Sequence, residues 1–250
     1  MLTPERHRVI LDLINNQRVA TVQELAEATS SSESTIRRDL LQLESEGKLT
    51  RFHGGAESVN MRSEETAFIE KVNQNQSEKA AIGQYAAKLV QPGDCIYLDA
   101  GTTTAQMIPH LNLNTIVVTN GLSVVESCLI RGLKTYLVGG EIKEKTRAVI
   151  GSGAVLSLHA YRFDKCFLGM NGVDHLHGFT TPDPEEASVK QMALKLATES
   201  YVLADASKWG KVSFSFVSDL ESSTLITNAV SDMERLRAIQ AKTHVEVVTQ

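Results

Sequence analysis

The chain has 250 residues, of which 42% are hydrophobic and 22% charged, and its formal net charge at pH 7 is −5. This is the composition of an ordinary globular protein with room for one large domain, or for one medium and one small domain. The acidic balance gives no overall sign of nucleic-acid binding, so DNA binding has to be argued from a local motif. No apolar run reaches about 18 residues and no signal-peptide core opens the chain, so we expect a soluble, cytoplasmic protein.

The beginning of the chain is predicted to form three helices. Thr3 can cap the first helix, along which spaced aliphatic residues form one apolar stripe. Thr21, followed three residues later by Glu24, is a capping-box pattern that opens the second helix. Ser32 is suited to cap the third helix, and Gly47 fits its end. A short strand with glycines at its tip then follows at residues 48–56, and we expect it to form a hairpin.

The third predicted helix has one buried and one exposed side. Ile36, Leu40 and Leu43 share one side of the helix, which makes that side the buried one. The opposite side presents hydroxyl groups and two arginines. Arginine can bond guanine through two hydrogen bonds, and hydroxyls can bond bases or phosphates, as a DNA-reading helix requires. The residues predicted to contact DNA, from this helix and the glycine-tipped strand, are Ser32, Ser34, Thr35, Arg37, Arg38, Lys48, Arg51, His53, Gly54 and Gly55.

The sequence leaves two questions about this helix open. Arg37 and Arg38 are adjacent and diverge around the helix, so they cannot both point into a groove. We expect Arg38 to contact bases and Arg37 a phosphate, with the reverse as the alternative. Asp39 is expected to orient an arginine or to cap structure rather than to touch DNA. Taken alone, the three-helix pattern also fits a small helical domain whose arginines are only solvated.

After a polar stretch, the rest of the chain alternates apolar strands with helical segments. This alternation indicates an α/β fold with a mostly parallel sheet and helices on both faces. The predicted strands are 95–100, 115–120, 135–139, 164–169, 201–205, 224–227 and 244–248. The predicted helices are 78–90, 104–110, 122–131, 153–160, 185–199 and 232–241. We therefore expect domains at residues 1–57 and 77–250, joined by a linker at 58–76.

The three cysteines of the chain are far apart and lie in apolar surroundings. No pair among Cys95, Cys128 and Cys166 has the spacing of metal ligands, and their number is odd. We expect buried, reduced thiols, which fits a reducing compartment. We predict no metal and no cofactor.

Polar residues follow several of the predicted strands. Residues 101–104 stand between a strand and a helix, where free N–H groups and the helix dipole favour an anion such as phosphate. Ligands of parallel α/β sheets bind beyond the carboxyl ends of the strands. Lys208 and this loop suit a sugar phosphate, and carboxylates and asparagines suit its hydroxyls. The residues predicted to bind this effector are Asp99, Gly101, Thr102, Thr103, Thr104, Asn120, Gly140, Asn171, Gly172, Asp174, Asp205 and Lys208.

Each of these polar groups, taken alone, also fits an ordinary turn or helix cap, but a family resemblance joins them to the first domain. The run STIRRDL at residues 34–40, preceded by Arg6 and spaced aliphatic residues, is followed by HGGA at residues 53–56. With these motifs, residues 3–56 resemble the winged helix-turn-helix domain of the DeoR family of bacterial sugar regulators. The resemblance implies DNA binding through the third helix and a wing.

Residues from about 77 to 250 resemble the effector domain of the same family, block by block in the same order. The matching blocks are at residues 99–104, 118–121, 138–140, 167–172, 185–190 and 204–208. The resemblance implies a fold similar to ribose-5-phosphate isomerase and glucosamine-6-phosphate deaminase, and it adds Glu186 and Lys190 to the effector site. Without it, these two residues, four apart on one helix, read as a surface ion pair.

The resemblance to the isomerases does not extend to their acidic residues. They carry Asp-Gly-Ala-Asp-Glu where this chain has NGVDH at residues 171–175, so the acidic pair needed to move a proton is incomplete. We expect a binding pocket without turnover, hence no catalytic residue. The alternative is a sugar-phosphate isomerase or deaminase with an accessory DNA-binding domain.

Within the family, the runs at residues 94–104, 161–169 and 180–183 are most similar to fructose-operon repressors of low-GC Gram-positive bacteria. This implies fructose 1-phosphate as effector, with tagatose 6-phosphate, sensed by lactose-type repressors, as the alternative. We therefore predict a homo-oligomeric repressor, dimer or tetramer, that binds double-stranded operator DNA, has no membrane partner and is released by a sugar phosphate. The sequence does not distinguish it from an activator built from the same domains.

Overall fold

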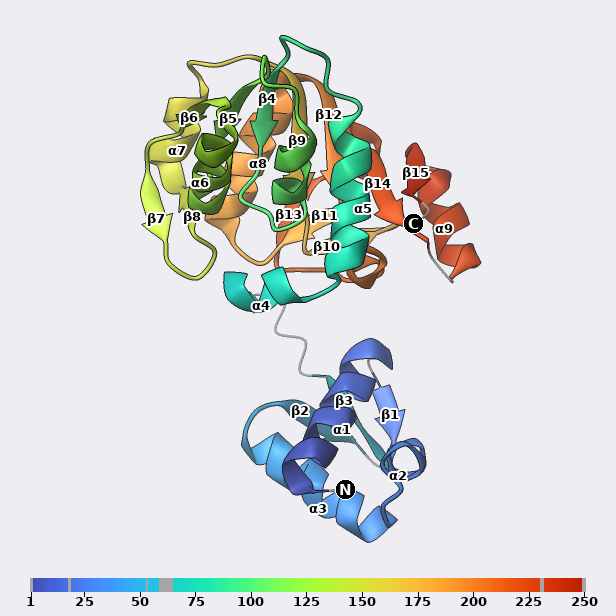
Figure 1. Cartoon of the computed structure of the whole chain (residues 1–250). Helices are drawn as coiled ribbons and strands as arrows, with labels where there is room; N and C mark the ends of the chain where they lie inside the picture. Colours follow the sequence, from blue (N-terminus) through green and yellow to red (C-terminus); the bar gives the residue numbers. More distant parts are fainter. Residues whose placement is uncertain (1, 18, 53, 59–64, 230–231, 249–250) are drawn as a thin grey trace. The chain divides into compact units, whose positions relative to one another are not determined.

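The structure is a computed structural model that describes residues 2–17, 19–52, 54–58, 65–229 and 232–248 (Figure 1). Contacts along the chain divide it into two compact units, Met1–Met61 and Arg62–Gln250, and each is described by itself. None of the helices among the described residues is long and apolar enough to cross a membrane.

The first unit contains three helices and a small antiparallel sheet. The helices are α1 (Thr3–Gln17), α2 (Val22–Thr29) and α3 (Glu33–Ser45). The strands pair in the order β1-β3-β2 and are β1 (Val19–Thr21), β2 (Leu49–Phe52) and β3 (Gly55–Ser58). The predicted helices and the hairpin are confirmed. The sequence did not indicate β1, because three residues are too few to show an alternating pattern.

The predicted caps of α2 and α3 are used, whereas α1 already begins at Thr3, so Thr3 lies inside that helix and does not cap it. The Thr21 hydroxyl accepts a hydrogen bond from the Glu24 N–H at 3.2 Å, and the Glu24 carboxylate accepts one from the Thr21 N–H at 2.7 Å. The Ser32 hydroxyl accepts the Thr35 N–H at the start of α3. The helices and sheet enclose a core that includes Ile10, Ile14, Leu25, Ile36, Leu40, Leu43 and Leu49.

The second unit is built on a seven-stranded sheet in which all neighbouring strands are parallel. Its order is β15-β14-β12-β9-β4-β5-β6. In chain order the strands are β4 (Cys95–Leu98), β5 (Ile116–Thr119), β6 (Lys134–Leu137), β9 (Phe163–Gly169), β12 (Ala197–Leu203), β14 (Thr224–Asn228) and β15 (Val245–Val248). Each corresponds to one of the seven predicted strands, so the α/β fold class is confirmed.

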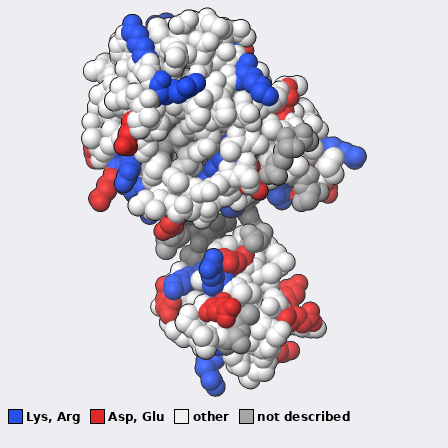
Figure 2. All heavy atoms as spheres, viewed as in Figure 1, with Lys and Arg blue, Asp and Glu red and all other residues white. Residues whose placement is uncertain are grey.

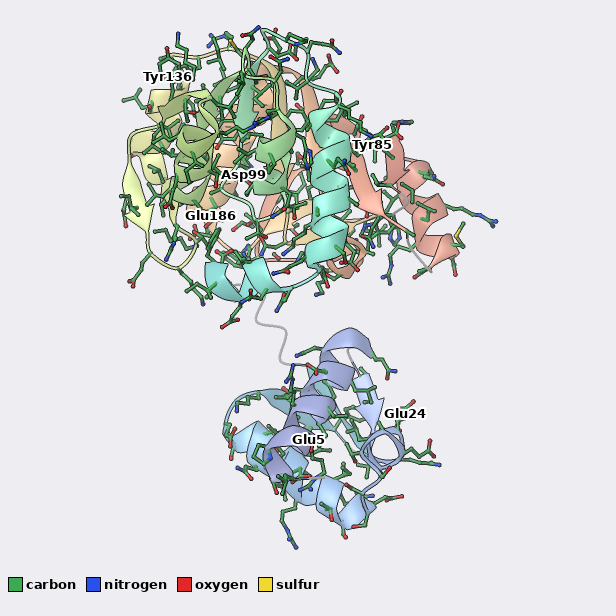
Figure 3. All side chains as sticks on the ribbon, viewed as in Figure 1. Glu5, Glu24, Tyr85, Asp99, Tyr136 and Glu186 are labelled. Atoms are coloured by element: carbon green, nitrogen blue, oxygen red, sulfur yellow. The ribbon has the colours of Figure 1, made fainter. Side chains whose placement is uncertain are left out.

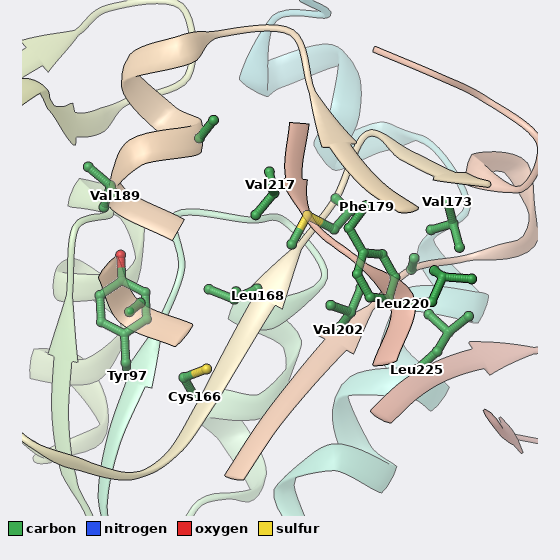
Figure 4. Packing of buried hydrophobic residues seen from close by; sticks show 14 of the residues in the cluster. Tyr97, Cys166, Leu168, Val173, Phe179, Val189, Val202, Val217, Leu220 and Leu225 are labelled. Atoms are coloured by element: carbon green, nitrogen blue, oxygen red, sulfur yellow. The ribbon is translucent and has the colours of Figure 1, made fainter. Parts of the chain in front are cut away.

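Helices cover both faces of this sheet. They are α5 (Gln76–Ala87), the 3-10 helix η1 (Thr104–His110), α6 (Leu122–Arg131), α7 (Gly151–Leu158), α8 (Pro184–Leu196) and α9 (Met233–Gln240). One apolar cluster joins α5, η1 and α6 to the sheet, and another joins α7, α8 and α9 to it. Figure 4 shows part of the second cluster, in which Tyr97, Leu168 and Val189 lie among other buried side chains.

Several short elements were not predicted from the sequence. The hairpin of β7 (Glu141–Lys143) and β8 (Ala148–Ile150) is one. A small antiparallel sheet has the order β10-β11-β13, with strands β10 (Gly172–Asp174), β11 (Gly178–Thr181) and β13 (Ser215–Ser218). Strands this short lack a readable period. Helix α4 (Phe68–Asn73) lies in the stretch predicted as linker, and residues from 65 onward belong to the second unit.

The cysteines are free thiols, as expected. Cys128 and Cys166 are buried, whereas Cys95 is half-buried. Burial raises the pKa of Cys128 to about 11 and that of Cys166 to about 12, so these two thiols are held in the protonated, unreactive form.

Candidate functional site

Helix α3 has the two sides that its sequence predicts. Ile36 and Leu40 are buried in the core of the first unit, and Ser34, Arg37 and Arg38 are exposed. The small domain with merely solvated arginines is therefore not distinguished from a DNA-reading domain by burial alone. The partners of the polar groups of α3 show which of them are already engaged within the chain.

The two arginines of α3 differ in their partners. The Arg37 guanidinium lies 3.2 Å from the Glu33 carboxylate, one turn earlier on the same exposed face. Arg38 has no ion-pair or hydrogen-bond partner among the described residues. Around the helix start, the Ser32 hydroxyl is 2.9 Å from the hydroxyls of both Ser34 and Thr35. Within the described residues, the Arg38 guanidinium is thus available for an outside partner, and its role in reading bases stays a prediction.

Asp39 of α3 bonds to side chains of α1. Its carboxylate accepts hydrogen bonds from the Arg6 guanidinium at 2.5 and 3.1 Å and lies 3.2 Å from His7 Nε2. Burial raises the pKa of Asp39, but the bonds to Arg6 and His7 outweigh burial and the net pKa is lowered. As expected, Asp39 orients an arginine, and that arginine is Arg6 of α1.

The basic residues of the wing are paired with acidic ones. The Lys48 ammonium lies 2.6 Å from Glu46, and the Arg51 guanidinium 3.6 Å from Glu44. Gly54 has a positive φ of 98°, and a Cβ at Gly55 would lie 2.4 Å from the Ala20 carbonyl, so both wing glycines are needed for the backbone path. His53, also predicted to contact DNA, lies outside the described residues.

Charges of both signs lie on the face of the molecule that Figure 2 shows. On the face that Figure 2 shows, lysine and arginine side chains are interspersed with aspartate and glutamate rather than gathered in one basic patch. This agrees with the formal charge of −5, and DNA contacts by particular side chains of α3 and the hairpin stay a prediction.

A pocket lies at the carboxyl edge of the parallel sheet, as predicted, beyond β4, β9 and β12. Figure 3 labels Asp99, which follows β4, and Glu186, which lies on α8. The predicted effector residues that line the pocket are Asp99, Gly101, Thr102, Thr103, Asn171, Glu186, Lys190 and Lys208.

A buried ion pair forms one wall of this pocket. The Lys190 ammonium lies 2.5 Å from Asp99 Oδ2, which also accepts the Gly169 N–H at 2.9 Å. Asp99 is 3% exposed and Lys190 5%. Burial lowers the pKa of Lys190, but Asp99 and Glu186 outweigh it, so the net pKa is raised and the lysine stays charged. The alternative of a surface pair between Glu186 and Lys190 is therefore wrong, since both are buried.

Another wall carries several lysines. The Lys208 ammonium has no hydrogen-bond or ion-pair partner in the part of the chain that the structure describes. Burial lowers its pKa to about 8; nearby Asp205 works against this, and nearby lysines, Lys71 and Lys79 among them, add to it. Burial also lowers the pKa of Lys79. A partly buried group of lysines beside the N–H groups of residues 101–103 is suited to an anion.

Three predicted effector residues shape the pocket loops without lining the pocket. The Thr104 hydroxyl donates to the carbonyls of its own loop, at Asp99 and Gly101. Asn120 is held by Tyr97, Ala100 and Val149. Asp205 Oδ1 accepts the Ser207 N–H at 3.0 Å and the Asn75 amide at 2.9 Å, whereas its buried Oδ2 has no hydrogen-bond partner among the described residues.

Three others also lie outside the pocket lining. A Cβ at Gly140 would come within 2.8 Å of the Ile150 carbonyl, and one at Gly172 within 2.4 Å of the Lys211 carbonyl, so these glycines allow close packing of the backbone. Asp174 accepts the N–H groups of Leu176 and His177 in the turn between β10 and β11. These positions are turn and packing residues, which was the alternative left open by the sequence.

One side of the pocket was not predicted from the sequence. Phe68, Lys71 and Lys79, from the polar stretch at the predicted linker and the helix after it, line it together with Thr146 and Met170. The apolar residues Phe68, Ile69 and Val72 of that stretch are too few to establish a helical period, and nothing local showed where its lysines would point.

Behind this side lies a cluster of acidic residues around one lysine. Carboxylate oxygens of Glu65, Asp183 and Glu186 lie within 4.8 Å of one another, a spacing that would suit a metal ion. The Lys143 ammonium bonds to all three, at 2.7, 2.5 and 3.2 Å. The cation of this cluster is therefore a lysine of the chain itself.

A helix-turn-helix unit with a wing, followed by an α/β unit with an anion-suited pocket, defines the class of ligand-responsive DNA-binding regulators. Residues 6–62 match the DeoR-like helix-turn-helix domain, and residues 74–229 match the DeoR C terminal sensor domain. The chain belongs to the DeoR family of DNA-binding transcriptional regulators.

Named relatives agree with this class. The chain is 47% identical to the uncharacterized HTH-type transcriptional regulator FruR of Bacillus subtilis, over 99% of either chain. It is 34% identical to the lactose phosphotransferase system repressor of Staphylococcus aureus, over 98% of either chain, and 36% identical to that of Streptococcus mutans, over 98% and 99%. These relatives are regulators, and the prediction that the chain is a regulator and not an enzyme is confirmed.

Solved structures share only part of the fold. Ribose 5-phosphate isomerase A from Methanocaldococcus jannaschii is 19% identical over 54% of this chain and 55% of that one, with a TM-score of 0.42. The translation initiation factor eIF-2B of Pyrococcus horikoshii is 10% identical over 85% and 72%, with a TM-score of 0.44.

Proposed function

We propose that this regulator represses a sugar-utilisation operon and leaves its operator when a phosphorylated sugar binds the pocket of the second unit. The observation that carries the proposal is the partly buried Lys208 at the carboxyl edge of the sheet, whose ammonium has no hydrogen-bond or ion-pair partner among the described residues. A buried cation without a partner is costly, and a phosphate would stabilise it. Repression is supported by the lactose phosphotransferase system repressors among the relatives.

The pocket has chemistry for both ends of a sugar phosphate. Lys208 and the 101–103 loop suit the phosphate, and Asp99, Glu186 and Asn171 suit hydroxyl groups. We propose fructose 1-phosphate as the effector, because the relative named FruR covers the whole chain at 47% identity. Tagatose 6-phosphate is the second candidate, favoured by the lactose repressors.

At the operator, the proposed complex is a homo-oligomer that places two copies of α3 in successive major grooves, about 34–36 Å apart or a multiple of that. The effector releases DNA by binding more tightly to the arrangement that cannot span the two half-sites. A ligand that bound both arrangements equally would have no effect. Because bacterial operator DNA lies in the cytoplasm, the proposal assigns the protein to that compartment.

A mobility-shift assay on DNA from upstream of the candidate sugar operon tests the proposal. The protein should retard this DNA, and fructose 1-phosphate should release it while fructose and inorganic phosphate do not. Release by tagatose 6-phosphate alone would change the effector and keep the mechanism. Retention of the DNA by the protein in every sugar phosphate would reject the proposal. A transcription assay with the same DNA separates repression from activation.

A further inference from the structure

Glu65 is a buried carboxylate at the point where the chain enters the second unit. It is 5% exposed, and residues 59–64 connect it to the winged unit. Its two oxygens are shared between two lysines: Lys71 bonds Oε1 at 2.7 Å and Lys143 bonds Oε2 at 2.7 Å. The covalent path from the DNA-binding unit is therefore anchored through one carboxylate and two ammonium groups.

Both of these lysines connect Glu65 to the effector pocket. Lys71 lines the pocket, and its backbone carbonyl accepts a hydrogen bond from the ammonium of Lys79, another pocket residue. Lys143 also bonds Glu186, whose side chain lines the pocket and accepts the Thr146 hydroxyl at 2.8 Å. An anion that entered beside Lys208 would thus meet a lysine already bonded to Glu65.

We propose that Lys71 and Lys79 are effector-binding residues and that the effector phosphate competes with Glu65 for Lys71. This inference rests on the proposed function and names how that site is regulated. A phosphate near neutral pH carries a charge of about −1.5 to −2 and three acceptor oxygens, so it is a stronger partner for an ammonium than one carboxylate is. Binding then loosens the anchor of the chain segment that leads to α3.

The proposal satisfies the energetic requirement for a switch. An effector shifts an equilibrium only by the difference in its affinity for the two states. The state in which Lys71 bonds Glu65 offers the phosphate one cation fewer than the state in which Lys71 is released. Linkage then requires that operator binding and effector binding oppose each other by the same factor.

The test compares Glu65→Gln with Glu70→Gln in the full-length protein. Glu70 lies on the same short helix, is exposed and has no ion pair among the described residues, so it is the matched control. Titration calorimetry with fructose 1-phosphate should show at least about fivefold tighter binding for Glu65→Gln, at the lower end of usual allosteric couplings, and no change for Glu70→Gln. Lys71→Met should weaken binding instead.

These opposite signs exclude a merely structural role, because damage to the pocket would weaken binding in both variants. Unchanged or weaker binding by Glu65→Gln would overturn the competition. The effector affinity is then measured with and without saturating operator DNA. The factor by which operator DNA weakens effector binding should be smaller in Glu65→Gln than in the wild type. The same factor in both proteins would overturn the coupling through Glu65. Wild-type protein that binds none of the sugar phosphates would instead refute the proposed function.

Discussion

Raising the pH from about 7 to about 9 is expected to weaken sugar-phosphate binding about tenfold through Lys208. In the free protein, burial holds the pKa of this lysine at about 8. A bound phosphate favours the charged ammonium and raises that pKa. Binding therefore takes up a proton above pH 8: affinity is nearly constant below that value and falls about tenfold for each unit above it.

Calorimetry with fructose 1-phosphate measures both the affinity and, in buffers of different ionisation enthalpy, the protons taken up. The second pKa of a phosphate monoester is about 6, so the ligand does not titrate in this range. Lys208→Met keeps the aliphatic chain and removes the ammonium, and it should bind more weakly at pH 7 and lose most of the pH dependence. A wild-type affinity for the sugar phosphate that does not change up to pH 9 would refute the reasoning. So would a Lys208→Met affinity that falls with pH as steeply as that of the wild type.

Three further predictions concern the winged unit. Arg38→Ala should weaken operator binding by about 1–3 kcal/mol and relax the base preference, if the arginine bonds a guanine through two hydrogen bonds; equal binding in a mobility shift would remove α3 from the interface. Arg6→Ala leaves the buried Asp39 without its main partner and should lower the free energy of unfolding in urea by about 1–3 kcal/mol; an unchanged midpoint would contradict the role given to this pair. Thr21→Ala removes one side of the capping box and should cost about 0.5–2 kcal/mol, whereas Thr21→Ser should retain most of the stability.

Local signals in the sequence were sufficient for the main elements. The seven strands of the large sheet are apolar runs between helical segments, and burial on both faces makes such runs continuous. The helices of the winged unit were located by caps, such as Thr21 with Glu24, that act within one turn. The carboxyl edge of the sheet followed from the parallel order, which brought Asp99 and Lys208 to one pocket.

Contacts between distant residues were not predictable from these signals. Asn120 was expected in the pocket, but its side-chain amide forms hydrogen bonds with three groups on other segments. Lys71 lies in a largely polar stretch where Phe68, Ile69 and Val72 are too few to establish a helical period, so neither its helix nor the direction of its side chain could be inferred. The ion pairs of Glu65 join residues up to 78 positions apart, and no spacing rule describes them.

Fluorescence anisotropy of labelled operator DNA bound to the full-length protein, titrated with fructose 1-phosphate, measures directly whether a phosphate beside Lys208 weakens the hold of α3 on DNA. The wild-type protein should dissociate as the sugar phosphate rises. Lys208→Met should bind the operator with the wild-type affinity and remain bound at concentrations that release the wild type. Dissociation of the variant at the wild-type concentration would contradict the account.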